Sequence, residues 1–152
     1  MSDKTVRVLF TGGGSGGPTI PLLALAQEIR KLKKNSEFLF LGSKLGPERK
    51  MVEQAEIPFS IIPSGKFRRY WNWKNFIDPL YILGGGITGL IYLLRFRPQV
   101  IVSAGSFVSV PVAYAAWLLR IPHVIMQMDL RSGLANRMMA PVSNALVFYF
   151  DI

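Results

Sequence analysis

Short apolar segments alternate along this chain with longer segments of helical periodicity. Runs of strand length lie at residues 6–10, 37–41, 59–62, 100–102, 124–128 and 145–148. Helix-length segments lie between them at 21–34, 47–54, 74–94, 110–119 and 134–139. Because the strand segments are almost wholly apolar, both of their faces must be covered. The pattern predicts an α/β fold, a Rossmann-like open parallel sheet with helices on both faces.

The predicted topology directs attention to the loops that follow the strands. In open parallel sheets, ligands bind beyond the carboxyl ends of the strands. Those ends are followed by loops at 11–20, 42–46, 63–73, 103–109 and 129–133. At 152 residues the chain fits one domain. The segment 145–150 reads as a buried strand with only two residues after it, so we expect a fragment of a longer protein.

Composition narrows the chemistry. The chain has no cysteine, which excludes disulfides and removes the preferred ligands of zinc and iron–sulfur sites. We expect no metal and no cofactor. The N-terminus lacks the regions of a signal peptide, which predicts a cytoplasmic protein. The net charge is +9, and Asp78 is the only acid between residues 57 and 128, so we expect anionic partners rather than a merely solvated basic face.

The most informative segment is the glycine-rich stretch 12–21, GGGSGGPTIP, between the first strand and the first helix. Such a turn leaves backbone N–H groups free at the positive end of a helix, which suits a phosphate or pyrophosphate. Gly12, Gly14 and Gly17 also have dinucleotide-binding spacing, but the acid expected after the second strand is missing. An NADP-binding module, with Ser43 and Lys44 on a 2′-phosphate, remains an alternative. The glycines could instead serve only a tight turn.

Four segments resemble glycosyltransferase family 28 in order and spacing. They are GGSGG-x-x-x-P-L-x-A-L-A at 13–26, Ser64 and Gly65 before a basic loop, PQVIVSAGSFVSVP at 98–111, and 115–136 with AAW, IP and GLAN. The resemblance implies that residues 1–152 are the N-terminal, acceptor-binding half of a GT-B enzyme of peptidoglycan synthesis. That enzyme transfers GlcNAc from UDP-GlcNAc to undecaprenyl-pyrophosphoryl-MurNAc-pentapeptide. UDP-GlcNAc would bind a C-terminal domain absent here, so the complete protein would be a hexosyltransferase and this part alone inactive.

The resemblance also assigns candidate site residues. The acceptor pyrophosphate would be bound by two loops, at Gly13, Gly14, Ser15, Gly16 and Gly17 and at Gly105 and Ser106. The acceptor sugar would lie near Pro18, Gln127 and Asn136, although Asn136 could equally be an amide on a helix surface. The family uses no metal, so positioning and base assistance would carry the reaction.

Two departures from the family pattern concern the catalytic base. Pro18 stands where the family has histidine, and it can neither accept nor donate a proton. Residues 126–129 read MQMD where the family has His-Glu-Gln-Asn, which leaves Asp129 as the candidate base or as a turn or helix-capping residue. His123, the only histidine, is expected to be packed rather than catalytic.

The segment 66–76, KFRRYWNWKNF, interleaves cations with aromatic residues and has no acid. This composition favours an anionic membrane surface, and single-stranded nucleic acid is the alternative that we do not expect. The expected interface residues are Lys66, Phe67, Arg68, Arg69, Trp71, Trp73 and Lys74. Residues 79–94 carry no charge but reach only about 24 Å, against a hydrocarbon core of about 30 Å. We therefore expect a helix half buried on the sheet and half in the interface, rather than a transmembrane span.

These observations leave a second class of function open. A non-catalytic subunit that docks a separate donor-binding chain to the membrane would carry the same loops and the same basic, aromatic segment. In either case we expect a peripheral protein on the inner face of the cell membrane.

Overall fold

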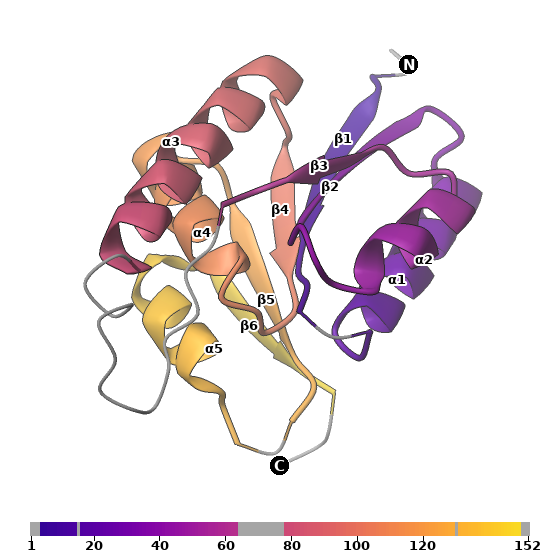
Figure 1. Cartoon of the computed structure of the whole chain (residues 1–152). Helices are drawn as coiled ribbons and strands as arrows, with labels where there is room; N and C mark the ends of the chain where they lie inside the picture. Colours follow the sequence, from indigo (N-terminus) through magenta and orange to yellow (C-terminus); the bar gives the residue numbers. More distant parts are fainter. Residues whose placement is uncertain (1–3, 15, 64–77, 130, 150–152) are drawn as a thin grey trace.

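The computed structural model describes residues 4–14, 16–63, 78–129 and 131–149, and its elements alternate as expected (Figure 1). The strands are β1 Val6–Thr11, β2 Ser36–Gly42, β3 Phe59–Ile61, β4 Val100–Ser103, β5 His123–Gln127 and β6 Ala145–Phe148. The helices are α1 Thr19–Leu32, α2 Glu48–Gln54, α3 Asp78–Phe96, α4 Ser109–Leu118 and α5 Leu134–Met139, followed by a short 3₁₀ turn, η2 Ala140–Val142. The predicted order of elements is confirmed, with boundaries shifted by a few residues.

The six strands form one parallel sheet in the order β3-β2-β1-β4-β5-β6. The chain builds outward from β1 to one edge and then returns to β4 to build toward the other. Strand order therefore reverses between β1 and β4, and the loops after these two strands diverge to opposite faces of the sheet. Figure 1 shows α1 and α2 on one face and α3, α4 and α5 on the other. This is the Rossmann-like arrangement that the apolar pattern predicts.

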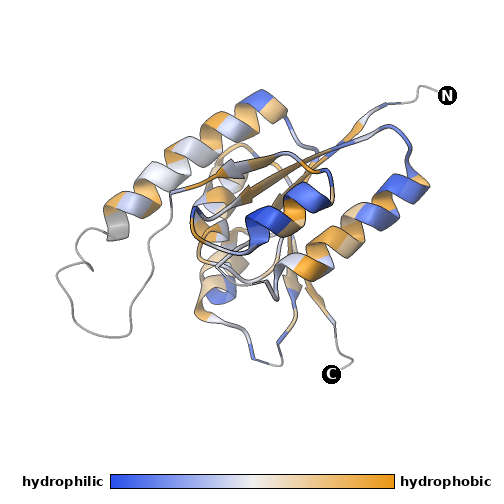
Figure 2. Ribbon diagram, turned by 45° about the vertical axis from the view of Figure 1, so that its right-hand side comes forward, coloured by the Kyte–Doolittle hydropathy of each residue, from blue (hydrophilic) through white to orange (hydrophobic). Residues whose placement is uncertain are grey.

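The two helical layers differ in polarity (Figure 2). Helix α1 buries Thr19, Leu22 and Ala26 and turns charged residues outward. Helix α3 buries Gly85, Gly89 and Leu93 on one side, while its outward side carries Leu80, Tyr81, Leu83, Ile87, Ile91 and Leu94. The buried side of the expected half-buried helix is confirmed, and its place in a membrane interface stays a prediction. No helix in the described parts of the chain is both long and apolar enough to cross a bilayer.

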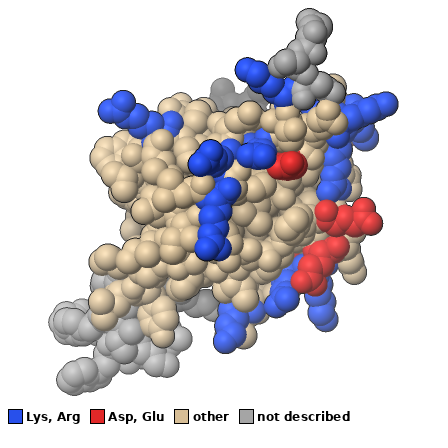
Figure 3. Space-filling model, turned by 90° about the horizontal axis from the view of Figure 1, so that it is seen from above, with Lys and Arg blue, Asp and Glu red and all other residues tan. Residues whose placement is uncertain are grey.

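Figure 3 shows the end of the molecule where the strands begin. On this face the charged side chains are scattered and do not form one patch. Among the described residues, the ion pairs are Arg7 with Glu37, Glu28 with Lys31 and Arg49 with Glu53, all between exposed side chains. Exposed pairs of this kind each contribute less than about 1 kcal/mol. The overall charge therefore does not locate a site on this face.

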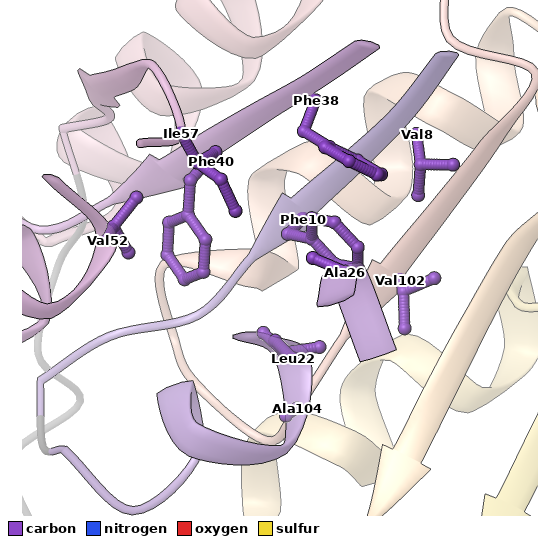
Figure 4. Close-up of a cluster of buried hydrophobic side chains, with 10 residues drawn as sticks. All are labelled: Val8, Phe10, Leu22, Ala26, Phe38, Phe40, Val52, Ile57, Val102 and Ala104. Atoms are coloured by element: carbon purple, nitrogen blue, oxygen red, sulfur yellow. The ribbon is translucent and has the colours of Figure 1, made fainter. Parts of the chain in front are cut away.

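The core between the sheet and the α1/α2 layer is a cluster of aromatic and aliphatic side chains (Figure 4). Phe10 and Phe38 from adjacent strands lie with ring centroids 5.7 Å apart, and Phe40 stacks on Phe59 at 5.9 Å. Leu22 and Ala26 of α1 close this cluster from above the sheet. Packing of α1 here fixes the position of its N-terminus, and with it the glycine-rich loop.

On the other face, α3 packs closely on α4. A Cβ at Gly85 would overlap the carbonyl oxygen of Pro63 and lie 3.1 Å from Cγ of Pro111, and one at Gly89 would lie 3.6 Å from Val112. The glycines thus let α3 approach its neighbours. One expectation is wrong: β6 is not a buried strand, because it lies at the sheet edge with Leu146, Val147 and Phe148 exposed.

Candidate functional site

The loops after β1 and β4 begin side by side at the carboxyl end of the sheet. The parallel register pairs Thr11, the last residue of β1, with Ser103, the last residue of β4. The first loop leads into α1 and the second into α4, so two helix N-termini from opposite layers face the same edge. This edge lies at the bottom of Figure 1. The sequence predicts both loops, and the register brings them together.

The first loop presents open backbone. Gly14 has φ of +84°, which favours glycine, and Gly14 and Gly17 are exposed with nothing within 4 Å of a would-be Cβ. Within the described residues, no acceptor binds the N–H groups of Gly16 or Gly17. Helix α1 has no side-chain cap at Pro18 and no acid in its first turn. The N–H groups of Thr19 and Ile20 donate to the carbonyl of Gly16 at 3.2 and 3.4 Å. No described side chain caps or neutralises this positive helix end, a setting that suits an anion.

The second loop repeats this chemistry with a different turn. Gly105 has φ of +59° and is exposed. The Ser106 side chain accepts the N–H of Val108 at 3.3 Å, and its carbonyl accepts the N–H of Ser109 at 3.0 Å. Helix α4 also lacks a side-chain cap and an acid in its first turn. The Ser106 hydroxyl keeps its own proton available for an anionic ligand.

A buried carboxylate that the sequence analysis missed lies beneath the first loop. Glu48, the first residue of α2, is 0% exposed. Its Oε1 accepts the N–H of Ser43 at 2.9 Å, the N–H of Gly14 at 3.4 Å and the Ser43 hydroxyl. A Cβ at Gly13 or Gly46 would overlap this carboxylate. The signal that could have found it is the pair of glycines, Gly42 and Gly46, just before the acid.

Glu48 changes the expectation for two of the predicted pyrophosphate ligands. The N–H of Gly14 is directed to the carboxylate rather than to a ligand. Gly13 is buried, and its lack of a side chain is required by the approach of Glu48. The approach of Glu48 explains the glycine at position 13, whereas the positive φ of +84° explains the glycine at position 14. Gly16 and Gly17 remain the open donors of this loop. Ser15 lies outside the described residues.

Gln127 and Asn136 form a buried amide pair beside the second loop. Asn136 donates to Oε1 of Gln127, and Gln127 donates to the carbonyls of Asp129 at 2.6 Å and of Arg131 at 3.2 Å. Asn136 is only 5% exposed, so the expectation of a helix-surface amide is wrong. Its amide lies 3.6 Å from a would-be Cβ of Gly105. Both side chains therefore organise the loops after β4 and β5 from within.

Asp129 and Pro18 lie at this edge as well. Asp129 is exposed in the loop after β5, and its backbone carbonyl is the one that Gln127 holds. It does not cap the next helix, because the N-cap of α5 is Gly133. Pro18 is half-buried at the N-cap of α1. Among the described residues, the carboxylate of Asp129 forms no hydrogen bond or ion pair.

His123 is packed, as expected. It is 0% exposed, and burial lowers the pKa of its imidazole to about 4, so the ring is neutral at pH 7. Its Nε2 lies 2.8 Å from the hydroxyl of Ser103 and its Nδ1 lies 3.1 Å from that of Ser143. Because Ser143 donates its proton to the carbonyl of Met139, it must accept from Nδ1–H, which leaves Nε2 to accept from Ser103. His123 therefore joins the end of β4 to the turn after α5.

Buried polar atoms without a partner concentrate at the same edge. Among the described residues, such atoms occur on Thr11, Thr19, Glu48, Ser109 and Asn136, and elsewhere on Ser36. Thr11 ends β1, while Thr19 and Ser109 begin α1 and α4. Unsatisfied buried groups are rare in folded proteins and call for an explanation such as a ligand, an ordered water or stored strain.

The dinucleotide alternative conflicts with this geometry. Ser43, which would hold a 2′-phosphate, spends both its N–H and its hydroxyl on Glu48. The buried Glu48 carboxyl occupies the space between the first loop and the end of β2, where the ribose of a dinucleotide would lie. No cluster of three or more metal-ligating side chains occurs in the part of the chain that the structure describes.

Lys66, Phe67, Arg68, Arg69, Trp71, Trp73 and Lys74 lie outside the described residues. Among the described residues, an apolar groove of about 570 Å³ lies between α3 and α4. Its lining includes Leu83, Gly86, Ile87, Tyr114, Leu118 and Met138.

The family model of the glycosyltransferase family 28 N-terminal domain matches residues 8–147. The chain belongs to glycosyltransferase family 28. Family 28 relatives in Legionella pneumophila (strain Corby) and Clostridium novyi (strain NT) are 42% and 40% identical to it over 144 residues, 95% of this chain. Both are named UDP-N-acetylglucosamine–N-acetylmuramyl-(pentapeptide) pyrophosphoryl-undecaprenol N-acetylglucosamine transferase. The chain spans 39% and 40% of their respective lengths.

Solved structures share the fold of this family 28 domain. MurG of Acinetobacter baumannii superposes with a TM-score of 0.80 at 21% identity, over 96% of this chain and 42% of that one. A UDP-GlcNAc 2-epimerase of Neisseria meningitidis bound to UDP-GlcNAc superposes with a TM-score of 0.58 at 15% identity, over 92% of this chain and 39% of that one. The fold is that of the N-terminal half of a GT-B glycosyltransferase, as the sequence predicts.

Proposed function

We propose that this chain is the acceptor-binding domain of an N-acetylglucosaminyltransferase of peptidoglycan synthesis. The whole protein transfers GlcNAc from UDP-GlcNAc to undecaprenyl-pyrophosphoryl-MurNAc-pentapeptide, and UDP-GlcNAc binds a C-terminal domain outside these 152 residues. The relatives' printed name supports this reaction, since the chain is 42% identical to one of them. Without the donor-binding domain, this domain is inactive.

The observation that carries the acceptor role is the pair of adjacent helix N-termini at the strand crossover. Gly16 and Gly17 on one side and Gly105 and Ser106 on the other offer N–H and hydroxyl groups, and neither α1 nor α4 has an acid in its first turn. A diphosphate holds two phosphate groups a few ångströms apart, so it can bind both loops at once. We assign these four residues, with Ser15, to the acceptor pyrophosphate.

The acceptor sugar then lies toward the loop after β5. Asp129 is the proposed general base, because it is exposed at this edge and has no competing capping role. Gln127 and Asn136 act indirectly, by holding the backbone of Asp129 and the turn at Gly105. Pro18 contributes to the shape of the site but cannot transfer a proton.

The membrane-facing side is the outward face of α3 with the adjoining part of α4. Leu83 and Ile87 of α3 and Trp117 of α4 are 64%, 57% and 59% exposed, a concentration of apolar surface that water does not favour. A lipid-linked acceptor requires the domain to reach the bilayer, and the cations of 66–74 would pair with anionic headgroups. We infer a peripheral protein on the cytoplasmic face.

The test of acceptor binding uses the whole gene product with UDP-GlcNAc and the lipid-linked sugar. Gly17→Glu places a negative charge at the open donor loop, and Gly17→Gln is the matched neutral control; both fit, because the space beside Gly17 is empty. A unit charge about 6 Å from the nearer phosphate alone costs about 1.4 kcal/mol at an effective dielectric of about 40, so the acceptor KM should rise at least about tenfold. The KM for UDP-GlcNAc should not change in either variant.

Other outcomes decide against parts of the proposal. Equal acceptor KM values for Gly17→Glu and Gly17→Gln would place the diphosphate elsewhere. Absence of transfer with the acceptor still bound would favour the docking subunit over the enzyme. Full activity of Asp129→Asn would remove Asp129 as the base.

Flotation with anionic vesicles tests the membrane face. Leu83→Asp should lower vesicle binding about thirtyfold, since a buried leucine contributes about 2 kcal/mol. Leu32→Asp, at an exposed apolar position on α1 in the opposite layer, is the matched control and should bind as the unmodified protein does. Release by salt or carbonate washes is expected. Equal loss in both variants would refute the assignment of this face.

A further inference from the structure

Among the described residues, the Glu48 carboxylate is the side-chain hydrogen-bond acceptor that ties the glycine-rich loop to α2 from beneath. It holds Gly14 of the loop after β1 and Ser43 of the loop after β2 with a single oxygen, Oε1. The three donors come from segments about 30 residues apart in sequence. The carboxylate thus sets the distance and orientation of one loop relative to the other.

Burial makes this contact rigid. Glu48 is 0% exposed, and Gly13, Gly42 and Gly46 all approach it so closely that a Cβ at each would touch or overlap its side chain. Val52, one turn further along α2, is also 0% exposed and packs in the core with Phe40. The helix that carries the carboxylate is therefore fixed against the sheet. Because the carboxylate accepts the N–H of Gly14, the loop is held in place by the same helix.

We propose that Glu48 is a positioning residue of the acceptor site, whose Oε1 fixes Gly14 so that the N–H groups of Gly16 and Gly17 point to the pyrophosphate. This inference rests on the proposed function. The role belongs to the hydrogen-bond acceptor and not to the negative charge, because a carboxylate beneath an anion site opposes the ligand electrostatically. Glu48 touches no reacting atom. Preorganised donors of this kind depend on the shell of residues that supports them.

The distinction between acceptor and charge yields a paired test. Glu48→Gln keeps a carbonyl oxygen that can accept from Gly14 and Ser43 but removes the charge. Glu48→Met keeps the approximate volume but removes the acceptor. Glu53→Gln, on an exposed position of the same helix, is the matched control. All are made in the whole gene product.

Two readouts separate this inference from the proposed function. The first is amide hydrogen exchange of Gly14 and Ser43 by NMR, which needs no substrate: exchange should be at least tenfold faster in Glu48→Met and close to the unmodified rate in Glu48→Gln. The second readout compares the KM for the acceptor with the KM for UDP-GlcNAc. In Glu48→Met the acceptor KM should rise at least tenfold while the KM for UDP-GlcNAc is unchanged, and in Glu48→Gln the acceptor KM should stay within about threefold of the unmodified value. If no transfer occurs at all, the exchange data still test whether Glu48 holds Gly14 and Ser43.

The results that would overturn the inference are equally specific. An unchanged acceptor KM in a folded Glu48→Met protein would remove the positioning role, and so would a Glu48→Gln protein as impaired as Glu48→Met. If Glu48→Met fails to fold, Gly46→Ala replaces it. Gly46 lies in the partly exposed loop before α2, and a Cβ on it would overlap the Glu48 carboxylate and displace it. That variant should show the same rise in acceptor KM, and an unchanged value would contradict the proposal.

Discussion

His123 should make the stability of this domain depend on pH in a window where few other groups titrate. The folded protein holds the imidazole neutral between Ser103 and Ser143, and burial lowers its pKa from 6.5 to about 4. The unfolded chain exposes the ring, which then titrates near 6.5. Between these two values the unfolded chain binds a proton that the folded chain does not.

The sign and size of the effect follow from linkage. Because the unfolded state binds more protons, the unfolding free energy falls as the pH is lowered from 6.5 toward 4. At about 1.4 kcal/mol per pKa unit, the full difference corresponds to about 3 kcal/mol, and about 2 kcal/mol of it is lost by pH 5. The contribution is fully present above pH 6.5. A stability of typically 5–15 kcal/mol makes such a loss easy to measure.

The assay combines denaturation with direct titration. Urea unfolding of the unmodified protein and of His123→Gln should be compared at pH 7.5, 6.0 and 5.0; the variant is expected to be less stable at pH 7.5 but to lack this part of the decline. Since the chain has one histidine, its imidazole NMR signals are unambiguous and should not titrate between pH 7.5 and 5. Titration of the His123 imidazole near pH 6.5 in the folded protein would refute the reasoning. So would an equal decline of the unfolding free energy with pH in the unmodified protein and in His123→Gln.

Two further predictions concern backbone positions. Gly84→Ala should raise the unfolding free energy by about 0.5–1 kcal/mol, since a Cβ on this helical residue meets nothing within 4 Å. Gly85→Ala should lower the unfolding free energy by about 2 kcal/mol, because its Cβ would overlap the Pro63 carbonyl. Similar thermal midpoints for the two variants would contradict the packing of α3. Arg120, which follows α4 with φ of +56°, should gain about 0.5–1 kcal/mol on replacement by glycine, raising Tm by about 2 °C. Arg95→Gly, inside α3, is the control and should lower Tm.

The fold was predictable because its determinants are local. Six apolar runs and the helical segments between them specify a covered parallel sheet, and the glycine-rich turn indicates where the first crossover begins. The burial of β6 was predicted wrongly because an apolar run does not report its place in the sheet. Leu146 and Val147 are apolar, yet they lie on the edge strand.

The site was predictable only in part. The open turns at Gly16, Gly17 and Gly105 could be predicted because such backbone needs glycine at recognisable places, while their ligand stays a prediction. The contacts of Glu48 could not be predicted, because its partners Gly14 and Ser43 come together only through the pairing of β1 with β2. The inward orientation of Asn136 was missed for a similar reason, since Gln127 reaches it only in the folded domain.

The crossover between β1 and β4 has a mechanical consequence. Its two loops belong to helical layers on opposite faces of the sheet, α1 on one and α4 on the other. A molecule gripped by both loops at once would act as a crosslink between layers that otherwise meet only through the sheet. Saturating ligand should therefore slow amide exchange throughout α1 and α4, far from any point of contact, and raise the melting temperature in proportion to the logarithm of its concentration.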